Sequence, residues 1–145
     1  MYLIDTNVIS EYRKGARANS GVTAFFAGAH ENTLFLPPQV IGEIQAGIAQ
    51  LRRRGDEALA ERAHAYERWL DGLITRFGDR ILEFDTDAAR LWGTLLSNQK
   101  KDPHTVDKQI AAIALLRNLT VVTRDKGDAF SRIPKLAVLN PFSGD

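Results

Sequence analysis

The sequence predicts an α/β domain in which a mostly parallel sheet of five strands carries helices on both faces. Short apolar runs alternate with longer segments whose apolar residues recur at helical spacing, and this alternation is typical of parallel sheets connected by helices. The hydrophobic share of 44% and the charged share of 26% are those of a globular protein. Because 145 residues is the size of one ordinary domain, we expect a single domain over residues 1–145.

The first quarter of the chain predicts strand, helix, helix and strand. The apolar run 2–4 predicts a buried strand, and the N-cap residues that follow at 5–7 begin a helix to Tyr12. Helical spacing of apolar residues predicts a second helix over 20–29, and the apolar run 33–36 predicts the second strand.

Prolines 37 and 38 end the second strand and suit the start of a helix. The remaining elements are predicted from the same periodicities. They are helices at 40–51 and 57–77, a strand at 81–84, a helix at 88–95 after the capping residues 85–87, a polar loop at 98–104, a helix at 107–119, a strand at 120–123, a loop or short helix at 124–131 and a strand at 136–139.

Four acidic residues fall where these strands end or where the next helices begin, and ligands of open α/β sheets bind beyond the carboxyl ends of the strands. Asp5 ends the first strand, and Glu43 lies in the first turns after the second. Asp107 opens the helix before the fourth strand, which Asp125 follows by two residues. Each also has a structural alternative, as a helix cap, a solvated helix position or a turn residue.

Convergence of these acids would define the chemistry of the site. Two close carboxylates repel each other by about 4 kcal/mol at an effective dielectric constant near 20, so a cluster must take up protons or bind a cation. The chain has no cysteine, and its three histidines show no ligand spacing and are assigned no metal role. Oxygen ligands alone suit Mg²⁺ or Mn²⁺, which can activate water for phosphodiester hydrolysis.

Charge and hydropathy limit the binding partners and the cellular location that we expect. The net charge of +1 does not by itself indicate a nucleic-acid-binding protein. The basic runs 52–54 and 100–101 can contact RNA phosphates, although a charge run at a helix end is more often a solvated face. The chain begins without a signal-peptide pattern and has no run long enough to span a bilayer, so we expect a cytoplasmic protein with no membrane partner.

Several segments carry a family resemblance. They are MYLIDTNVISE at 1–11, VIGEIQAGI at 40–48, DKQIAAIA at 107–114, VTRDKGDAF at 122–130 and LNPF at 139–142. In this order they resemble PIN-domain proteins, especially the VapC- and FitB-type toxins of bacterial type II toxin–antitoxin pairs. The resemblance covers nearly the whole chain, and it implies a PIN-like three-layer α/β/α sandwich.

The resemblance also implies an endoribonuclease that depends on Mg²⁺ or Mn²⁺. Asp5 and Asp107 would be the principal metal ligands, and Glu43 and Asp125 would complete the acidic pocket directly or through waters. Some relatives place the fourth acid three residues further on, at Asp128, so both positions stay open. We prefer Asp125 because it is nearer the strand end.

Two threonines beside the acids, Thr6 and Thr123, can bind a water or phosphate oxygen or can cap a loop or helix. The resemblance implies an RNA substrate, a homodimer, and a cognate antitoxin of the VapB or FitA type that blocks the pocket. A hetero-oligomer with the antitoxin is the alternative assembly, and operator DNA would be reached only through the antitoxin. Two other functions stay open, a non-enzymatic antitoxin-binding co-repressor and a metal-dependent DNA nuclease or phosphatase.

Overall fold

The computed structural model describes residues 1–97, 101–127 and 129–144, and in this part of the chain four strands form one sheet. The strands are β1 (Tyr2–Ile4), β2 (Leu34–Phe35), β3 (Thr120–Val122) and β4 (Val138–Leu139). Their order is β2-β1-β3-β4, and all neighbouring pairs run parallel. The predicted parallel α/β class is confirmed, although β2 and β4 are shorter than predicted.

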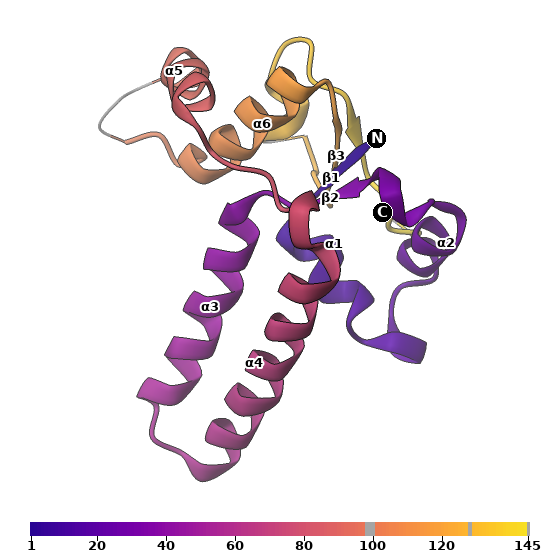
Figure 1. Ribbon diagram of the computed structural model, residues 1–145, viewed down its shortest axis with the longest axis vertical. Coiled ribbons are helices and arrows are strands. Elements are labelled where there is room, and N and C mark those ends of the chain that lie inside the picture. The colour runs from indigo at the N-terminus through magenta and orange to yellow at the C-terminus, as the bar shows by residue number, and fades with distance from the viewer. Residues whose placement is uncertain (98–100, 128, 145) are drawn as a thin grey trace.

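Helices cover both faces of this sheet, as predicted (Figure 1). In the described ranges they are α1 (Thr6–Tyr12), α2 (Ser20–Gly28), α3 (Pro38–Arg53), α4 (Glu57–Phe77), α5 (Thr86–Leu95) and α6 (Thr105–Arg117). Because side chains alternate along a strand, Leu3 packs in the core formed with α5 and α6, whereas Ile4 packs in the core formed with α1 to α4. The three-layer α/β/α sandwich is therefore confirmed, and α3 and α4 project from it as a hairpin.

The predicted strand at 81–84 is the exception, and in the described part of the chain the sheet has four strands rather than the five predicted. Ile81 forms only a single parallel bridge with Leu36, framed by backbone hydrogen bonds of 3.0 and 2.9 Å. The pairing cannot extend because alternate residues of a parallel strand bond to the same neighbour, and Pro38, the next residue after Leu36 to face this segment, has no backbone N–H and is the first residue of α3.

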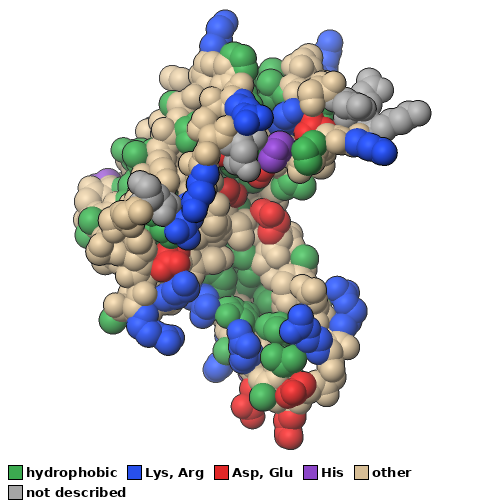
Figure 2. Space-filling model, turned by 180° about the vertical axis from the view of Figure 1, so that it is seen from behind, with side chains coloured by type: hydrophobic (Ala, Val, Ile, Leu, Met, Phe, Trp, Pro, Cys, Tyr) green, Lys and Arg blue, Asp and Glu red, His purple; other side chains and the backbone are tan. Residues whose placement is uncertain are grey.

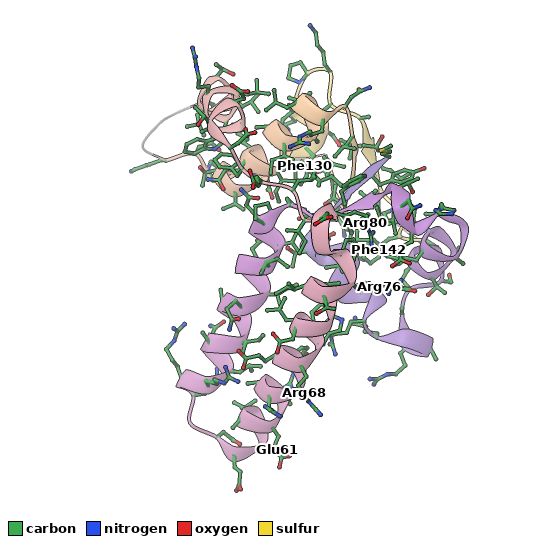
Figure 3. All side chains as sticks on the ribbon, viewed as in Figure 1. Glu61, Arg68, Arg76, Arg80, Phe130 and Phe142 are labelled. Carbon is green, nitrogen blue, oxygen red and sulfur yellow. The ribbon has the colours of Figure 1, made fainter. Side chains whose placement is uncertain are left out.

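Arg80 stabilises this unpaired edge with its side chain. Its guanidinium donates to the carbonyl oxygens of Glu31 at 2.8 Å, Leu34 at 2.9 Å and Arg76 at 3.0 Å. Figure 3 shows Arg76 and Arg80 near each other where α4 ends. One charged group thus satisfies a carbonyl oxygen of β2, one at the end of α4 and one in the turn before β2.

The boundaries of α6 also differ from the prediction, by two residues at each end. Asn118 adopts a left-handed conformation, with φ of 56°, and ends the helix there. The start at Thr105 places Asp107 inside the first turn rather than at the cap. No helix of the described ranges combines the length and apolar character needed to cross a membrane.

Gly21 allows the C-terminal segment to pack closely against α2. A Cβ at this position would lie 2.2 Å from the carbonyl oxygen of Pro141 and 2.6 Å from the backbone nitrogen of Ser143. Gly21→Ala should therefore lower the free energy of unfolding by about 1–3 kcal/mol, measured by urea denaturation. The matched control is Gly28→Ala in the same helix, where a Cβ meets nothing within 4 Å. Wild-type stability in Gly21→Ala would contradict this close packing.

Candidate metal-binding active site

Asp5 lies at the carboxyl end of β1 and is only 6% exposed. It is the N-cap of α1, and its Oδ1 accepts a hydrogen bond from the Thr6 backbone N–H at 2.8 Å. Its Oδ2 accepts from the Thr123 hydroxyl, also at 2.8 Å. The two bonds hold the carboxylate in one orientation, and they offset part of the free-energy cost of burying it.

The same burial perturbs the acidity of Asp5. Desolvation raises the pKa of this carboxyl from 3.8 to about 6, because a buried carboxylate loses hydration. The hydrogen bonds from Thr123 and Thr6 oppose this rise, and the negative charges of Asp107 and Glu43 add to it. Asp5 is therefore a carboxylate whose charged form is disfavoured by its surroundings, and a bound cation would relieve both causes.

A cavity of about 160 Å³ opens over Asp5 at this edge of the sheet. Three of the predicted acids, Asp5, Asp107 and Asp125, contribute to its lining. The other lining residues are Asn7, His104, Thr123, Arg124, Ala129 and Phe130. Figure 2 shows acidic side chains on a concave face, with Lys and Arg side chains on either side of them. The structure thus brings together acids that are distant in the sequence.

Glu43 lies beside this cavity rather than in its lining. Its Oε1 accepts a hydrogen bond from the Thr6 hydroxyl at 2.7 Å. Its negative charge also helps to raise the pKa of Asp5. It lines instead a groove of about 320 Å³ between α1, α3 and α4. The hydroxyls of Thr6 and Thr123 therefore each donate to an acid of the site, and both orient carboxylates in this structure.

Asp125 organises the loop that follows β3. Its Oδ1 accepts from the Ala129 N–H at 3.3 Å, and its Oδ2 accepts from the Ser131 N–H at 2.9 Å and from the Ser131 hydroxyl. Partial burial raises the pKa of Asp125, but these hydrogen bonds outweigh it and lower the pKa overall. Asp125 therefore both stabilises the turn through its hydrogen bonds and lines the cavity. Asp128, the alternative fourth acid, lies outside the described residues.

Two further residues of the cavity were missed from the sequence. Asn7 donates to the Thr123 hydroxyl oxygen at 3.3 Å and accepts from the Arg124 backbone N–H at 3.1 Å, which ties the β3 loop to α1. His104 places its Nδ1 3.5 Å from Oδ2 of Asp107. The three-residue spacing of His104 and Asp107 was the available clue, because such residues are neighbours at the start of a helix.

The donor set fits a hard divalent cation. Mg²⁺ commonly binds through one or two carboxylates and completes its shell with waters, and Asp5 and Asp107 supply two such carboxylates in a polar cavity. In the described ranges, no three His, Asp or Glu side chains converge into a ready-formed metal site. A cation here would therefore depend on few protein ligands.

Comparisons with known proteins identify related sequences and folds. A model of the PIN domain matches residues 2–136. Three relatives each align with 98% of this chain: plasmid stability protein StbB of Pseudomonas syringae pv. tomato (32% identical, 99% of its length), toxin FitB of Neisseria gonorrhoeae (32%, 99%) and VapC ribonuclease Y4jK of Sinorhizobium fredii (30%, 98%).

Solved structures show the same likeness. FitAcB from Neisseria gonorrhoeae superposes with a TM-score of 0.77 and 33% identity, over 97% of this chain and 98% of that one. FitAB bound to an IR36 DNA fragment gives a TM-score of 0.76 and 30% identity, over 97% of this chain and 95% of that one.

Asp5 should make the stability of the metal-free protein depend on pH. Its pKa is about 6 in the fold and 3.8 otherwise, so the native state binds more protons between these values and loses stability as pH rises through them. In EDTA at pH 8, Asp5→Asn should unfold with a free energy about 1–2 kcal/mol higher than wild type, after allowing for one lost hydrogen bond. This gain should vanish at pH 4.

Urea denaturation at the two pH values measures this difference. Asp71→Asn, which changes an exposed residue of α4, is the matched control for loss of one carboxylate. Identical pH dependence in wild type and Asp5→Asn would contradict the raised pKa.

Proposed function

This chain belongs to the PIN-domain family, and we propose that it is the toxin of a type II toxin–antitoxin pair. Its activity is that of an endoribonuclease dependent on Mg²⁺ or Mn²⁺. The observation that carries this proposal is the buried Asp5 carboxylate, whose pKa is raised beside other acids in a polar cavity. The full-length similarity to a VapC ribonuclease supports it. The chain acts as one PIN domain over residues 1–145, in the cytoplasm and as a homodimer.

Each acid has a distinct part in the proposed reaction. Asp5 and Asp107 hold the cation, and the Thr123 hydroxyl fixes the orientation of the Asp5 carboxylate. Glu43, oriented by Thr6, adds negative charge at the border of the cavity. When bound, the cation supplies an activated water and neutralises charge on the phosphodiester.

Asp125 is the preferred fourth acid. It lines the same cavity as Asp5 and Asp107, and its lowered pKa keeps it ionised. Its second role is to hold the β3 loop against the site, through its bonds to Ala129 and Ser131. Loss of Asp125 would therefore affect both the charge and the shape of the cavity.

We propose that the groove between α1, α3 and α4 is the binding site of the antitoxin. Its lining includes Ile44, Ile48 and Trp69, and it ends at Thr6 and Glu43, beside the acids. Its lining also includes Arg13 and Arg62, so it suits a peptide with apolar side chains, a basic side chain directed at Glu43 and an acidic side chain directed at the arginines. Occupation of this groove would bring a partner to the site entrance, which explains inhibition without a change of fold.

The catalytic proposal predicts loss of RNA cleavage in Asp5→Asn and in Asp107→Asn. Because each variant removes an anionic cation ligand, the cleavage rate should fall by at least about 100-fold, measured with labelled RNA in Mg²⁺ or Mn²⁺. EDTA should stop the wild type. Asp87→Asn, an exposed residue in the first turn of α5, should retain activity.

Full activity in both Asp5→Asn and Asp107→Asn, with EDTA-resistant cleavage, would refute the assignment. The same assay on Asp125→Asn and Asp128→Asn decides which residue is the fourth acid. A matching DNA oligonucleotide separates an RNase from a DNA nuclease, and antitoxin binding without any cleavage would favour the co-repressor.

The antitoxin proposal predicts that a side chain added at Gly47 blocks binding. Gly47 lines the groove, and a Cβ there meets nothing within 4 Å, so Gly47→Gln fills the groove without disturbing the fold. Affinity for the cognate antitoxin should fall at least about tenfold, or 1.4 kcal/mol, by isothermal titration calorimetry. Gly72→Gln on α4, where a Cβ also meets nothing within 4 Å, is the matched control. Equal affinities of both variants would place the antitoxin elsewhere.

A further inference from the structure

A second hollow adjoins the acid cavity. It measures about 410 Å³, and its lining comes from residues 95–97, 102–108 and 129–134. His104 and Ala129 line both spaces, so together they form a shared wall. The polar residues Ser97, Asp102, Lys108 and Arg132 contribute to the second space, which we call the Arg132 hollow.

The first turn of α6 explains why the two spaces differ in charge. Asp107 and Lys108 are consecutive and therefore about 100° apart around the helix axis. His104 precedes them by three and four residues, so it lies next to both. Accordingly Asp107 lines the acid cavity, Lys108 lines the Arg132 hollow, and His104 lines both.

A partly buried ion pair fixes the helix side of the hollow. The Asp102 side chain is 3% exposed, and its Oδ2 lies 2.5 Å from the Lys108 ammonium. Asp102 also accepts from the backbone N–H groups of His104 at 2.9 Å and Ser97 at 3.1 Å. The charges of Asp102 and Lys108 therefore offset each other, and the pair holds His104 in place.

Arg132 is the remaining cation among the described residues that line the hollow. It lies on the loop that Asp125 holds through Ala129 and Ser131, and its Nε donates to the carbonyl oxygen of Gly127 at 2.9 Å. With the Asp102–Lys108 pair neutral overall, Arg132 makes the hollow net positive. The adjoining cavity contains three acids and Arg124, and is net negative.

We propose that the Arg132 hollow binds a backbone phosphate of the RNA strand, next to the phosphodiester held at the acids. This inference rests on the proposed function. Consecutive nucleotides each carry one phosphate, so a strand crossing the acid cavity brings a neighbouring phosphate to an adjoining space. A guanidinium is suited to bind that group. Repulsion from Asp107 would act on an acidic protein segment and on a phosphate alike, so the continuity of the RNA strand between the two adjoining spaces is what favours RNA.

Salt dependence of RNA binding tests this phosphate contact. Fluorescence anisotropy of a labelled 12-nucleotide single-stranded RNA, in Ca²⁺ to limit turnover, gives the association constant over a range of KCl concentrations. Removing one phosphate contact in Arg132→Gln should reduce the magnitude of the log–log salt slope by about 0.7. Arg132→Lys should retain most of the slope, because the charge remains.

Arg117→Gln is the matched control, since Arg117 is exposed in the last turn of α6, at the end opposite Asp107. Thermal melts monitored by circular dichroism establish that each variant is folded. An unchanged slope and affinity in folded Arg132→Gln would overturn the inference, and so would an effect on antitoxin binding alone. RNA that binds with the expected slope but is never cut would refute the ribonuclease and leave the phosphate site standing.

Discussion

The burial of the Asp5 carboxylate is the constraint around which the site is arranged. Asp5 lies between the end of β1 and the start of α1, so secondary structure on both sides fixes its backbone. Its side chain lines the cavity. Threonine hydroxyl and backbone donors hold the charge, and neighbouring acids destabilise it. This combination leaves a carboxylate that is oriented but electrostatically strained, which is the state that a cation stabilises.

The parallel sheet supplies the convergence that such a site requires. Because β1 and β3 are adjacent and parallel, their carboxyl ends place Asp5 beside Thr123 although 118 residues separate them. The short β2 ends two residues before Pro37, and α3 then carries Glu43 to the border of the same region. One sheet edge therefore collects groups from three separate parts of the chain.

Acidic and basic side chains line two separate but adjoining spaces at the carboxyl ends of the strands. The first turn of α6 directs Asp107 and Lys108 into adjoining spaces, and His104 stands between them. Asp125 lines one space and holds the loop that carries Arg132 to the other. A change in either loop would therefore alter the acidic and the basic space together, which couples the proposed cation site to the proposed phosphate site.

The sequence by itself determined the α/β class, the helices and the position of Asp5, because periodicity, prolines and capping residues are local properties of the chain. The strand predicted at 81–84 was wrong, since pairing there depends on whether Pro38 can continue the ladder that Leu36 begins. Nor did the sequence indicate Asn7, His104 or the Asp102–Lys108 pair as parts of the site. Only the tertiary structure decided those, because hydrogen bonds, burial and charge interactions depend on distances between segments that sequence spacing does not specify.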